Sequence, residues 1–458
     1  MEVERKLVGF VLDTKYEDLP QGTLDFVKNL VLGVIGTTIA GSNEEDCKKM
    51  IGLVKEWGGR QEATILTDGH KVPAHAAAFV NSILARALDY EDGLTPGVHF
   101  TASIVPAALA AAELAGGCKG KDFLVAVLLG SELTAKLNSC SFYDGFDPTG
   151  IASVFGATAA AGRIMHLNSA EMLDALALAF NRAGGSFQCN IDGVLAVRTI
   201  QGFVSEGSLM AARLAQKGIT GPPNFVEGIY GYLHLYGKDR FKPQDVTKDL
   251  GTKFELHNTL CKRYPSCGST LSSTEGILEI IAKNDLSPEE VARVEIRLTP
   301  YGHKLVGHQF KIGNSPRVDA QFNVQYCVAN AILRKSSKLI HFEESFIKDP
   351  QIKDLVQKIY VIPDPALQDP GSERGLSSDV AVTLKGGKVY HQFVKVARGM
   401  PGNPLSKDEH LEHFQDCMSY AKKPLPKRKI NKIISLIDQI EKVKDIRNLI
   451  SLMLVSSK

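Results

Sequence analysis

The feature that most constrains the fold is the helical periodicity that runs through the first half of the chain. Apolar residues recur at helical spacing from Leu24 to Gly36 and from His75 to Leu88, and Ala-rich or Gly-containing stretches continue to Ala215. The box Asn168-x-x-Glu171 can satisfy the free backbone donors at the start of a further helix. The same texture marks segments 103–115, 122–137 and 151–164. This half is predicted to be all-helical.

Near residue 270 the helical spacing of apolar residues gives way to a strand-like pattern. Segments 294–298 and 358–362 read as strands, and 380–384 with 389–396 reads as a hairpin around Gly386-Gly387. Helical segments fall between these strands. After the box Ser406-x-x-Glu409, apolar spacing predicts a packed amphipathic helix through Ile430, Ile433, Ile434, Ile437 and Ile440. The fold class is therefore mainly α with an α+β second domain.

Length and charge narrow the class further. With 458 residues, the chain is too long for one hydrophobic core. The 53 basic and 51 acidic residues give a net charge of +2 without a basic block, so neither nucleic acid nor an anionic membrane is expected as the main partner. The start lacks the apolar core of a signal peptide, and no run of about 18 apolar residues is evident, so a cytoplasmic location is expected.

The eight cysteines are scattered, without the paired short spacings of a zinc or iron–sulfur site. They are expected to be reduced and mostly buried. Cys261 and Cys267 do not have a zinc spacing, and no His/Cys pair follows them nearby, so no metal is predicted.

The segment from Asp89 to His99 is the first candidate for chemistry. It places several ionisable side chains on a Gly/Pro-broken loop between two helical stretches. Surrounding helices can hold a carboxylate and an imidazole rigidly and partly out of water, where their pKa values can be tuned for proton transfer. The alternative is a solvated connection.

The second candidate is the segment from Cys261 to Gly268, in which Lys262 and Arg263 precede a Pro-punctuated turn at the domain boundary. A cleft between domains can desolvate these cations and strengthen their hold on a carboxylate. The alternative is that both cations are solvated at a linker.

Three further residues are candidates with a structural alternative each. Arg198 follows a glycine-rich approach and could bind an anion or lie on the surface. Asp147 precedes a small-residue helix and could be its cap. Tyr326 lies on an apolar helical stretch, where core packing is the default. His303 and His308 follow a predicted strand and are interpreted as surface histidines.

These segments, in this order, resemble the MmgE/PrpD family, which includes 2-methylcitrate dehydratase, cis-aconitate decarboxylase and iminodisuccinate epimerase. The resemblance covers nearly the whole chain. It is carried by Ala87–Asp92 with His99, by Gly202 through Leu214–Pro222, by Lys262–Pro265, and by Val382–Gly387 followed by Gly402–Ser406.

The resemblance implies a helical domain begun by residues 1–267, an α+β lid at 268–402, and C-terminal helices at 403–458 that return to the helical domain. It also implies a homodimer and no metal or organic cofactor. The positions that match catalytic or substrate-binding residues of the family are Asp89, His99, Lys262 and Tyr326. Arg198 stands where relatives often have Lys.

Three positions depart from the family pattern. Gly93 stands where the decarboxylase has a Thr, Asp147 replaces a catalytic His, and the segment after Pro265 lacks the His that commonly follows. These departures disfavour the decarboxylase and weaken the dehydratase assignment.

The resulting hypothesis is a cofactor-independent lyase that removes a proton α to a carboxylate in a small di- or tricarboxylic acid, in the manner of 2-methylcitrate dehydratase. His99 would transfer the proton with Asp89 as its partner. Lys262, Arg198 and Arg263 would hold carboxylates, and Tyr326 would donate to a substrate oxygen. The rivals are an epimerase or isomerase of a dicarboxylate, a decarboxylase, and a non-catalytic carboxylate-binding relative.

Overall fold

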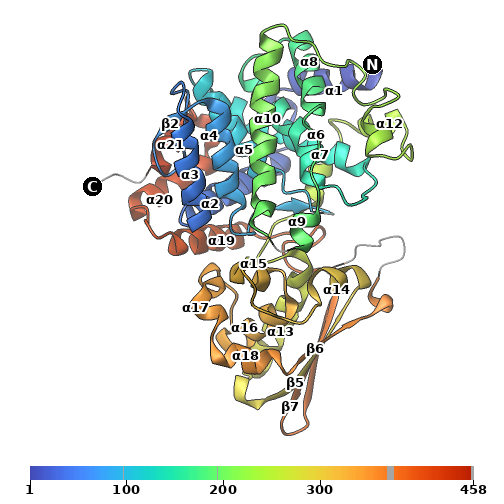
Figure 1. Cartoon of the computed structure of the whole chain (residues 1–458), viewed down its shortest axis with the longest axis vertical. Coiled ribbons are helices and arrows are strands. Elements are labelled where there is room, and N and C mark those ends of the chain that lie inside the picture. The colour runs from blue at the N-terminus through green and yellow to red at the C-terminus, as the bar shows by residue number, and fades with distance from the viewer. Residues whose placement is uncertain (96, 193, 369–375, 455–458) are drawn as a thin grey trace.

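The computed structural model describes residues 1–95, 97–192, 194–368 and 376–454. It consists of a large helical body and a smaller unit in which helices pack on a sheet (Figure 1). The predicted mainly α fold with a smaller α+β part is confirmed. Two large clusters of buried apolar side chains correspond to the two parts.

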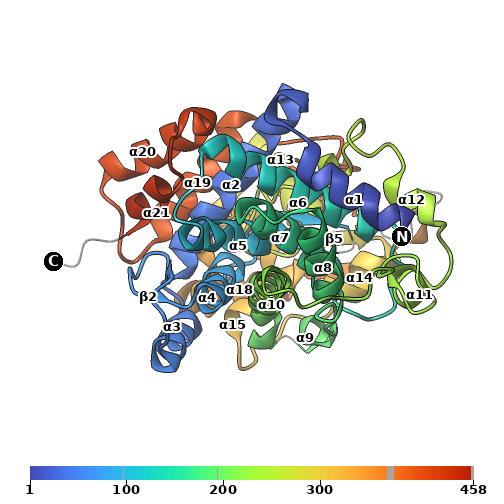
Figure 2. The same ribbon diagram turned by 90° about the horizontal axis from the view of Figure 1, so that it is seen from above.

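The helical body is built around α5 and α7, which the neighbouring helices enclose when the molecule is seen from above (Figure 2). Small residues on α6, α7 and α10 allow these helices to pack closely. At Gly130 and Gly156 an added Cβ would collide with the backbone of the facing helix. The longer helices are α1 (Glu2–Asp13), α2 (Gln21–Gly41), α3 (Glu45–Trp57), α4 (Ala74–Arg86), α5 (Thr101–Leu114), α6 (Gly120–Ser139), α7 (Pro148–Ile164), α8 (Ser169–Phe180) and α10 (Thr199–Gln216). The shorter elements are α9 (Gln188–Ile191), α11 (Tyr232–Leu235), α12 (Pro243–Thr247), β1 (Ala63–Thr64) and β2 (Lys71–Val72).

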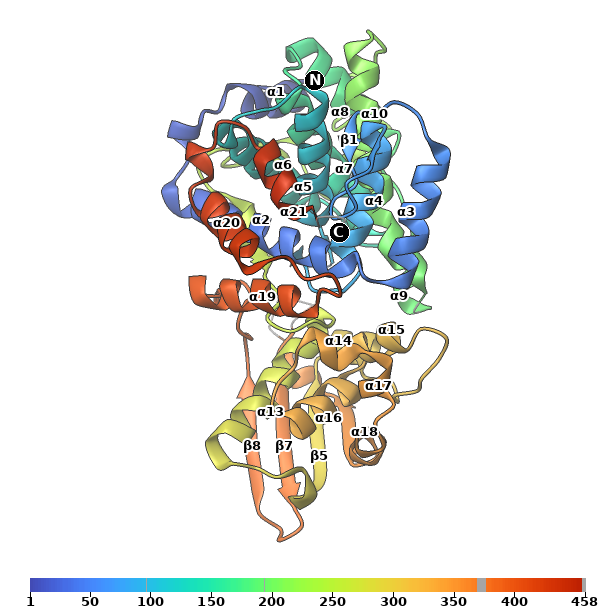
Figure 3. The ribbon, with the colours of Figure 1, turned by 90° about the vertical axis from the view of Figure 1, so that its left-hand side faces the viewer.

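The C-terminal helices complete this body. α19 (Lys407–Tyr420) packs on α2, α20 (Lys427–Asp438) packs on α2 and α21 (Arg447–Met453), and α21 reaches α5 (Figure 3). The boxes predicted at Asn168–Glu171 and Ser406–Glu409 both form. Ile433, Ile437 and Ile440 are buried as their spacing predicted.

The smaller unit contains a four-stranded sheet in the order β6-β5-β7-β8. β5 runs parallel to β6, whereas β7 is antiparallel to both β5 and β8. The predicted hairpin turns at Gly387, whose φ of 82° favours glycine. The strands are β5 (Val291–Leu298), β6 (Ile359–Pro363), β7 (Ser378–Leu384) and β8 (Val389–Val394). The helices are α13 (Leu271–Asn284), α14 (Pro300–Val306), α15 (Pro316–Gln321), α16 (Val324–Arg334), α17 (Glu344–Ile347) and α18 (Pro350–Val356).

One expectation about membrane spans is corrected. By length and a mean hydropathy of 1.3, α2 is apolar enough to cross a membrane, although no such run was expected. In the structure 72% of that apolar window is buried, because α2 packs against α4 and α19. α2 is therefore explained as a core helix of the helical body.

Candidate active site

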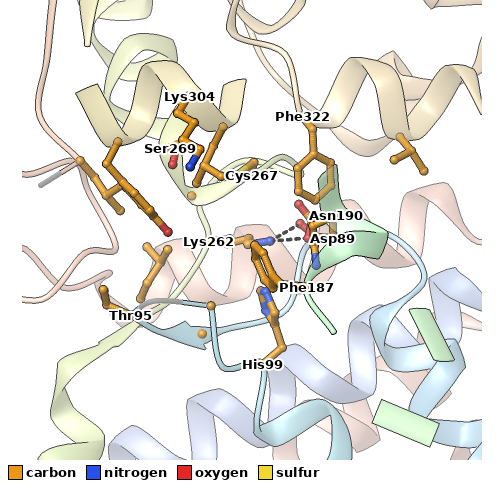
Figure 4. A pocket seen from close by; sticks show the side chains of 18 of the residues that line it. Asp89, Thr95, His99, Phe187, Asn190, Lys262, Cys267, Ser269, Lys304 and Phe322 are labelled. Atoms are coloured by element: carbon orange, nitrogen blue, oxygen red, sulfur yellow. Dashed lines mark hydrogen bonds and ion pairs between the residues drawn. The ribbon is translucent and has the colours of Figure 1, made fainter. Parts of the chain in front are cut away.

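A cavity of about 250 Å³ lies where the helical body meets the smaller unit. The loop after α4 forms its floor, together with a short pairing of β3 (Gly93–Leu94) with β4 (Thr259–Leu260). This pairing brings the loop of His99 next to Lys262, although 163 residues separate them in the sequence. Figure 4 shows both side chains, with Lys304 and Ser269 on the opposite side of the cavity.

Four side chains that line the cavity and one buried beside them, Glu91, form what we call the buried charge cluster: Arg86, Asp89, Glu91, His99 and Lys262. Arg86 ends α4 and pairs with Asp89 and with Glu91, whose carboxylate is 3.0 Å away. Lys262 Nζ lies 2.9 Å from Asp89 Oδ1 and donates to the Asp89 backbone oxygen at 2.8 Å. Two cations therefore balance two carboxylates out of water.

The backbone at Asp89 explains how its side chain enters the cluster. Its φ of 51° is in the left-handed region, which Asp tolerates better than most residues, and the chain turns there out of α4. Asp89 as a whole is only 3% exposed, so neighbouring charges rather than water must stabilise its carboxylate. Burial raises the pKa of Asp89, but Lys262 and Arg86 outweigh this effect and hold it below its ordinary value.

His99 is held through one ring nitrogen. Nδ1 lies 2.9 Å from Glu91 Oε1 and 2.9 Å from the backbone oxygen of Asp92. Both oxygens can only accept a hydrogen bond while Glu91 is ionised, so the geometry assigns a proton to Nδ1. Burial raises the pKa of Glu91, but Arg86, Lys262 and His99 outweigh this effect. They hold the pKa well below its usual range and keep Glu91 ionised. In the tautomer with its proton on Nδ1, Nε2 is the hydrogen-bond acceptor of a side chain that lines the cavity.

This arrangement corrects the predicted partnership. Asp89 was expected to orient His99, but Glu91 does so, and Asp89 instead pairs with Lys262 and Arg86. The sequence could not separate the two carboxylates, because the direction of each side chain in an irregular loop depends on backbone angles.

Two predicted substrate-binding residues, Arg198 and Arg263, and the predicted catalytic residue Tyr326 do not line the cavity. Arg198 is buried against Asp46, 2.7 Å from its carboxylate, so its charge is already used. Arg263 lies on a separate groove beside α13 and α19, 3.6 Å from Glu409. Tyr326 packs in the core of the smaller unit and donates its hydroxyl to the backbone oxygen of His341, because a buried phenol needs an acceptor.

Asp147 has the structural role that its position before a helix allowed, that of a helix cap. It is the N-cap of α7 and accepts from the backbone N of Thr149 at 2.8 Å. The Thr149 hydroxyl in turn accepts from the backbone N of His99 at 3.0 Å. Asp147 thus supports the histidine loop through α7, although it does not line the cavity.

Sequence reasoning missed the residues that the smaller unit contributes. Tyr301, Lys304 and His308 all line the cavity from α14 and the turn after it. Thr299 caps this helix by accepting from Gly302 N at 3.1 Å, and Pro300 follows at the first position. The Thr-Pro pair was a usable sign of a helix start, but nothing local indicated that the helix faces Lys262.

Among the described residues, Asp89, Glu91 and His99 form the group whose potential ligand atoms lie close enough to share a metal ion, all within 4.8 Å. Arg86 and Lys262 already contact these two carboxylates. A divalent cation placed there would be repelled by two buried positive charges. The donor set therefore suits a proton-transfer site better than a metal centre.

The fold and this site define a two-part protein with the buried charge cluster at the cavity between its parts. Residues 5–244 match the MmgE/PrpD N-terminal domain, and residues 264–439 match the MmgE/PrpD C-terminal domain. The chain belongs to the MmgE/PrpD family.

Three similar curated proteins are cis-aconitate decarboxylases, all at low sequence identity. The cis-aconitate decarboxylase of Mus musculus is 21% identical, over 97% of this chain and 91% of the relative. That of Homo sapiens is 22% identical, over 91% and 87%, respectively. That of Aspergillus terreus is 23% identical, over 75% and 74%.

Proposed function

We propose that this protein is a cofactor-independent lyase that removes a proton α to a carboxylate of a small di- or tricarboxylic acid and then eliminates water. The observation that carries the proposal is the single-sided fixing of His99, whose Nδ1 is held by Glu91 and the Asp92 carbonyl. Nε2 is thereby left to act as a general base. Membership of a family with cis-aconitate decarboxylases supports lyase chemistry on carboxylic acids.

Lys262 stabilises the charge that forms when the proton leaves. Removal of an α-proton places negative charge on the carboxylate oxygens, which hydrogen-bond donors fixed in advance can stabilise. The ammonium group has three N–H donors; one is donated to the Asp89 backbone oxygen, and a second can serve the ion pair with Asp89 Oδ1. The third is left for the substrate.

Loss of hydroxide from the substrate also needs a proton donor. Tyr326, predicted for this role, lies in the core, whereas Tyr301 lines the cavity from α14. We assign the role to Tyr301. Tyr301→Phe should lower elimination about 10-fold or more while α-proton exchange continues, and Tyr326→Phe should not separate the two rates. Equal loss of both rates in Tyr301→Phe would remove it from the elimination step.

A second candidate is an epimerase or isomerase, and one observation favours it. His308 lines the cavity from the smaller unit, facing a site whose other histidine belongs to the helical body. Partial desolvation lowers the pKa of His308 against the opposing effect of Asp319, so its ring is neutral at pH 7. In a two-base mechanism, the neutral imidazole on one face would remove the proton, and the other histidine, as an imidazolium, would deliver a proton to the opposite face.

One experiment tests the proposal and separates the candidates. The protein is incubated in D₂O with a panel of hydroxy- and amino-carboxylates, and the products are followed by NMR. Deuterium at one α-position with formation of an alkene supports the lyase, and deuterium with inversion supports the epimerase. Binding without any exchange would indicate a non-catalytic relative. A homodimer and a cytoplasmic location remain proposals, which sedimentation and cell fractionation test.

A further inference from the structure

The charges that line the cavity are nearly balanced before any substrate enters. Arg86 and Lys262 are neutralised by Asp89 and Glu91. In the part of the chain that the structure describes, Lys304 is the lining cation without an ion-pair partner.

Two more carboxylates, Asp192 and Asp319, also line the cavity. Both accept hydrogen bonds from neutral donors: Asp192 from the Gln188 amide at 2.8 Å and Asp319 from the Gly313 backbone N at 2.6 Å. No described cation pairs with either of them, so a carboxylate at either position opposes the entry of additional anions. A substrate with three carboxylates would bring three negative charges to the cavity. Among the described residues, Lys304 is the lining cation that is not already in an ion pair.

Apolar side chains make up much of the remaining wall. They come from both parts of the molecule, and Phe187 and Phe322 face the region above His99 and Lys262 in Figure 4. The aliphatic members of the wall are Leu94, Leu260, Leu305, Val318 and Leu376. Burial of an alkyl or aryl group against this wall is favourable, whereas desolvation of a carboxylate there costs free energy.

We infer that the substrate is a small acid with at most two carboxylates and an apolar substituent, and that Lys304 receives one of the carboxylates. The inference rests on the proposed function for the position of the reacting carboxylate, which lies by His99 and Lys262. Lys304 binds the second carboxylate at the opposite side, where its exposed ammonium remains partly hydrated. The apolar substituent lies against the leucine and phenylalanine wall.

Calorimetric binding to the wild-type protein tests the substrate class without requiring turnover. The probes are malate, 2-methylmalate, 2-isopropylmalate and 2-benzylmalate, with citrate and 2-methylcitrate as tricarboxylates. Affinity should rise about fourfold for each methylene that is buried in the wall. The best alkylmalate should bind at least about 10-fold more tightly than citrate. Tighter binding of either tricarboxylate than of every alkylmalate would overturn the inference.

A matched pair of variants tests Lys304. Lys304→Gln should weaken binding of the best dicarboxylate about 5- to 10-fold, a modest loss because the ammonium is exposed. Lys311→Gln, on the exposed segment that follows α14 and outside the cavity lining, is the control and should bind like the wild type. Equal affinities of the wild type and Lys304→Gln would remove Lys304 from substrate binding.

The same titrations distinguish the two levels of the argument. Alkylmalates that bind tightly but exchange no α-proton in D₂O would refute the proposed function and leave the substrate class standing. Citrate that binds best and exchanges its proton would do the reverse.

Discussion

The two faces of the cavity satisfy their polar groups in different ways. On the helical-body face, Asp89, Glu91 and Lys262 are buried and paired within one cluster, so that each charge has a fixed neighbour. On the face of the smaller unit, Lys304 is exposed, and apolar side chains surround it. Under the proposed function, removal of the α-proton therefore belongs to the first face, whereas the second face recognises the substrate and supplies the proton for the leaving group. Groups that must keep one protonation state need fixed partners, whereas groups that receive a ligand need unfilled donors.

The largest effect is expected from the histidine of the first face. His99→Ala should lower α-proton exchange at least about 10²-fold, because the general base is lost, with the circular dichroism spectrum unchanged. His308→Ala, the matched change on the second face, should lower it less than about fivefold if the comparison holds. Losses of similar size in the two variants would contradict the division of labour and favour the two-base epimerase.

The next effect concerns the group that holds His99. Glu91→Gln should lower exchange about 10- to 100-fold, because the buried negative charge beside Nδ1 that stabilises the imidazolium formed on proton removal is lost, and it should also shift the pH profile of exchange. Removing a partner of buried Arg86 should cost stability, up to about 3 kcal/mol. The control is Glu132→Gln, a buried carboxylate of α6 that accepts from the backbone N of Glu255 and Leu256 at 3.0 Å. It should lose stability without a shift in the profile, and an unshifted profile in Glu91→Gln would remove Glu91 from the mechanism.

A smaller effect should follow from crowding the same ring. A Cβ at Gly93 would lie 3.3 Å from Nδ1 and 3.4 Å from Cε1 of His99, so the imidazole must move by a few tenths of an ångström. Gly93→Ala should therefore lower exchange about 5- to 10-fold with little change in substrate binding. Gly386→Ala, in the hairpin turn with open space around its Cβ, is the control. Full activity of Gly93→Ala would show that the position of the ring is not critical.

The sequence predicted the elements well and the site only in part, for a physical reason. Capping boxes and strand alternation are local, so α8, α19 and the four strands of the sheet could be predicted from their own residues. That Glu91, and not Asp89, contacts His99 depends on the backbone angles of the loop, which include a left-handed φ at Asp89. The contribution of Lys304 follows from how the two parts pack. Neither leaves a local pattern.

The cavity also shows where family matching misled. Arg198 matched a family position that often holds Lys, yet Asp46 uses its charge in this chain. Tyr326 was matched to a site residue, yet its hydroxyl is bonded inside the core. A residue type at a matched position predicts chemistry only when its neighbours leave the group free, and those neighbours come from distant segments.

The smallest expected effect on turnover concerns Asp92, which lies behind the first face. Its carboxylate accepts from the Thr101 hydroxyl while its backbone oxygen holds His99. Burial, against the opposing Thr101 hydrogen bond, raises the pKa of Asp92 to about 7. Asp92→Asn, which mimics the protonated form, should change exchange less than about threefold, because the backbone contact to His99 remains.

Stability, in contrast, should respond to Asp92 with a definite sign. Between its ordinary pKa of 3.8 and about 7, the folded protein holds a proton that the unfolded chain has released, so this contribution to stability decreases as pH rises. Nearby His410 and His413 have pKa values lowered to about 4 by burial, so they do not titrate in the upper part of this range. From pH 5.5 to 8.0 the wild type should lose about 2 kcal/mol more free energy of unfolding than Asp92→Asn, measured by urea titration. Parallel pH dependences in the two proteins would show that Asp92 titrates at its ordinary value in the folded protein.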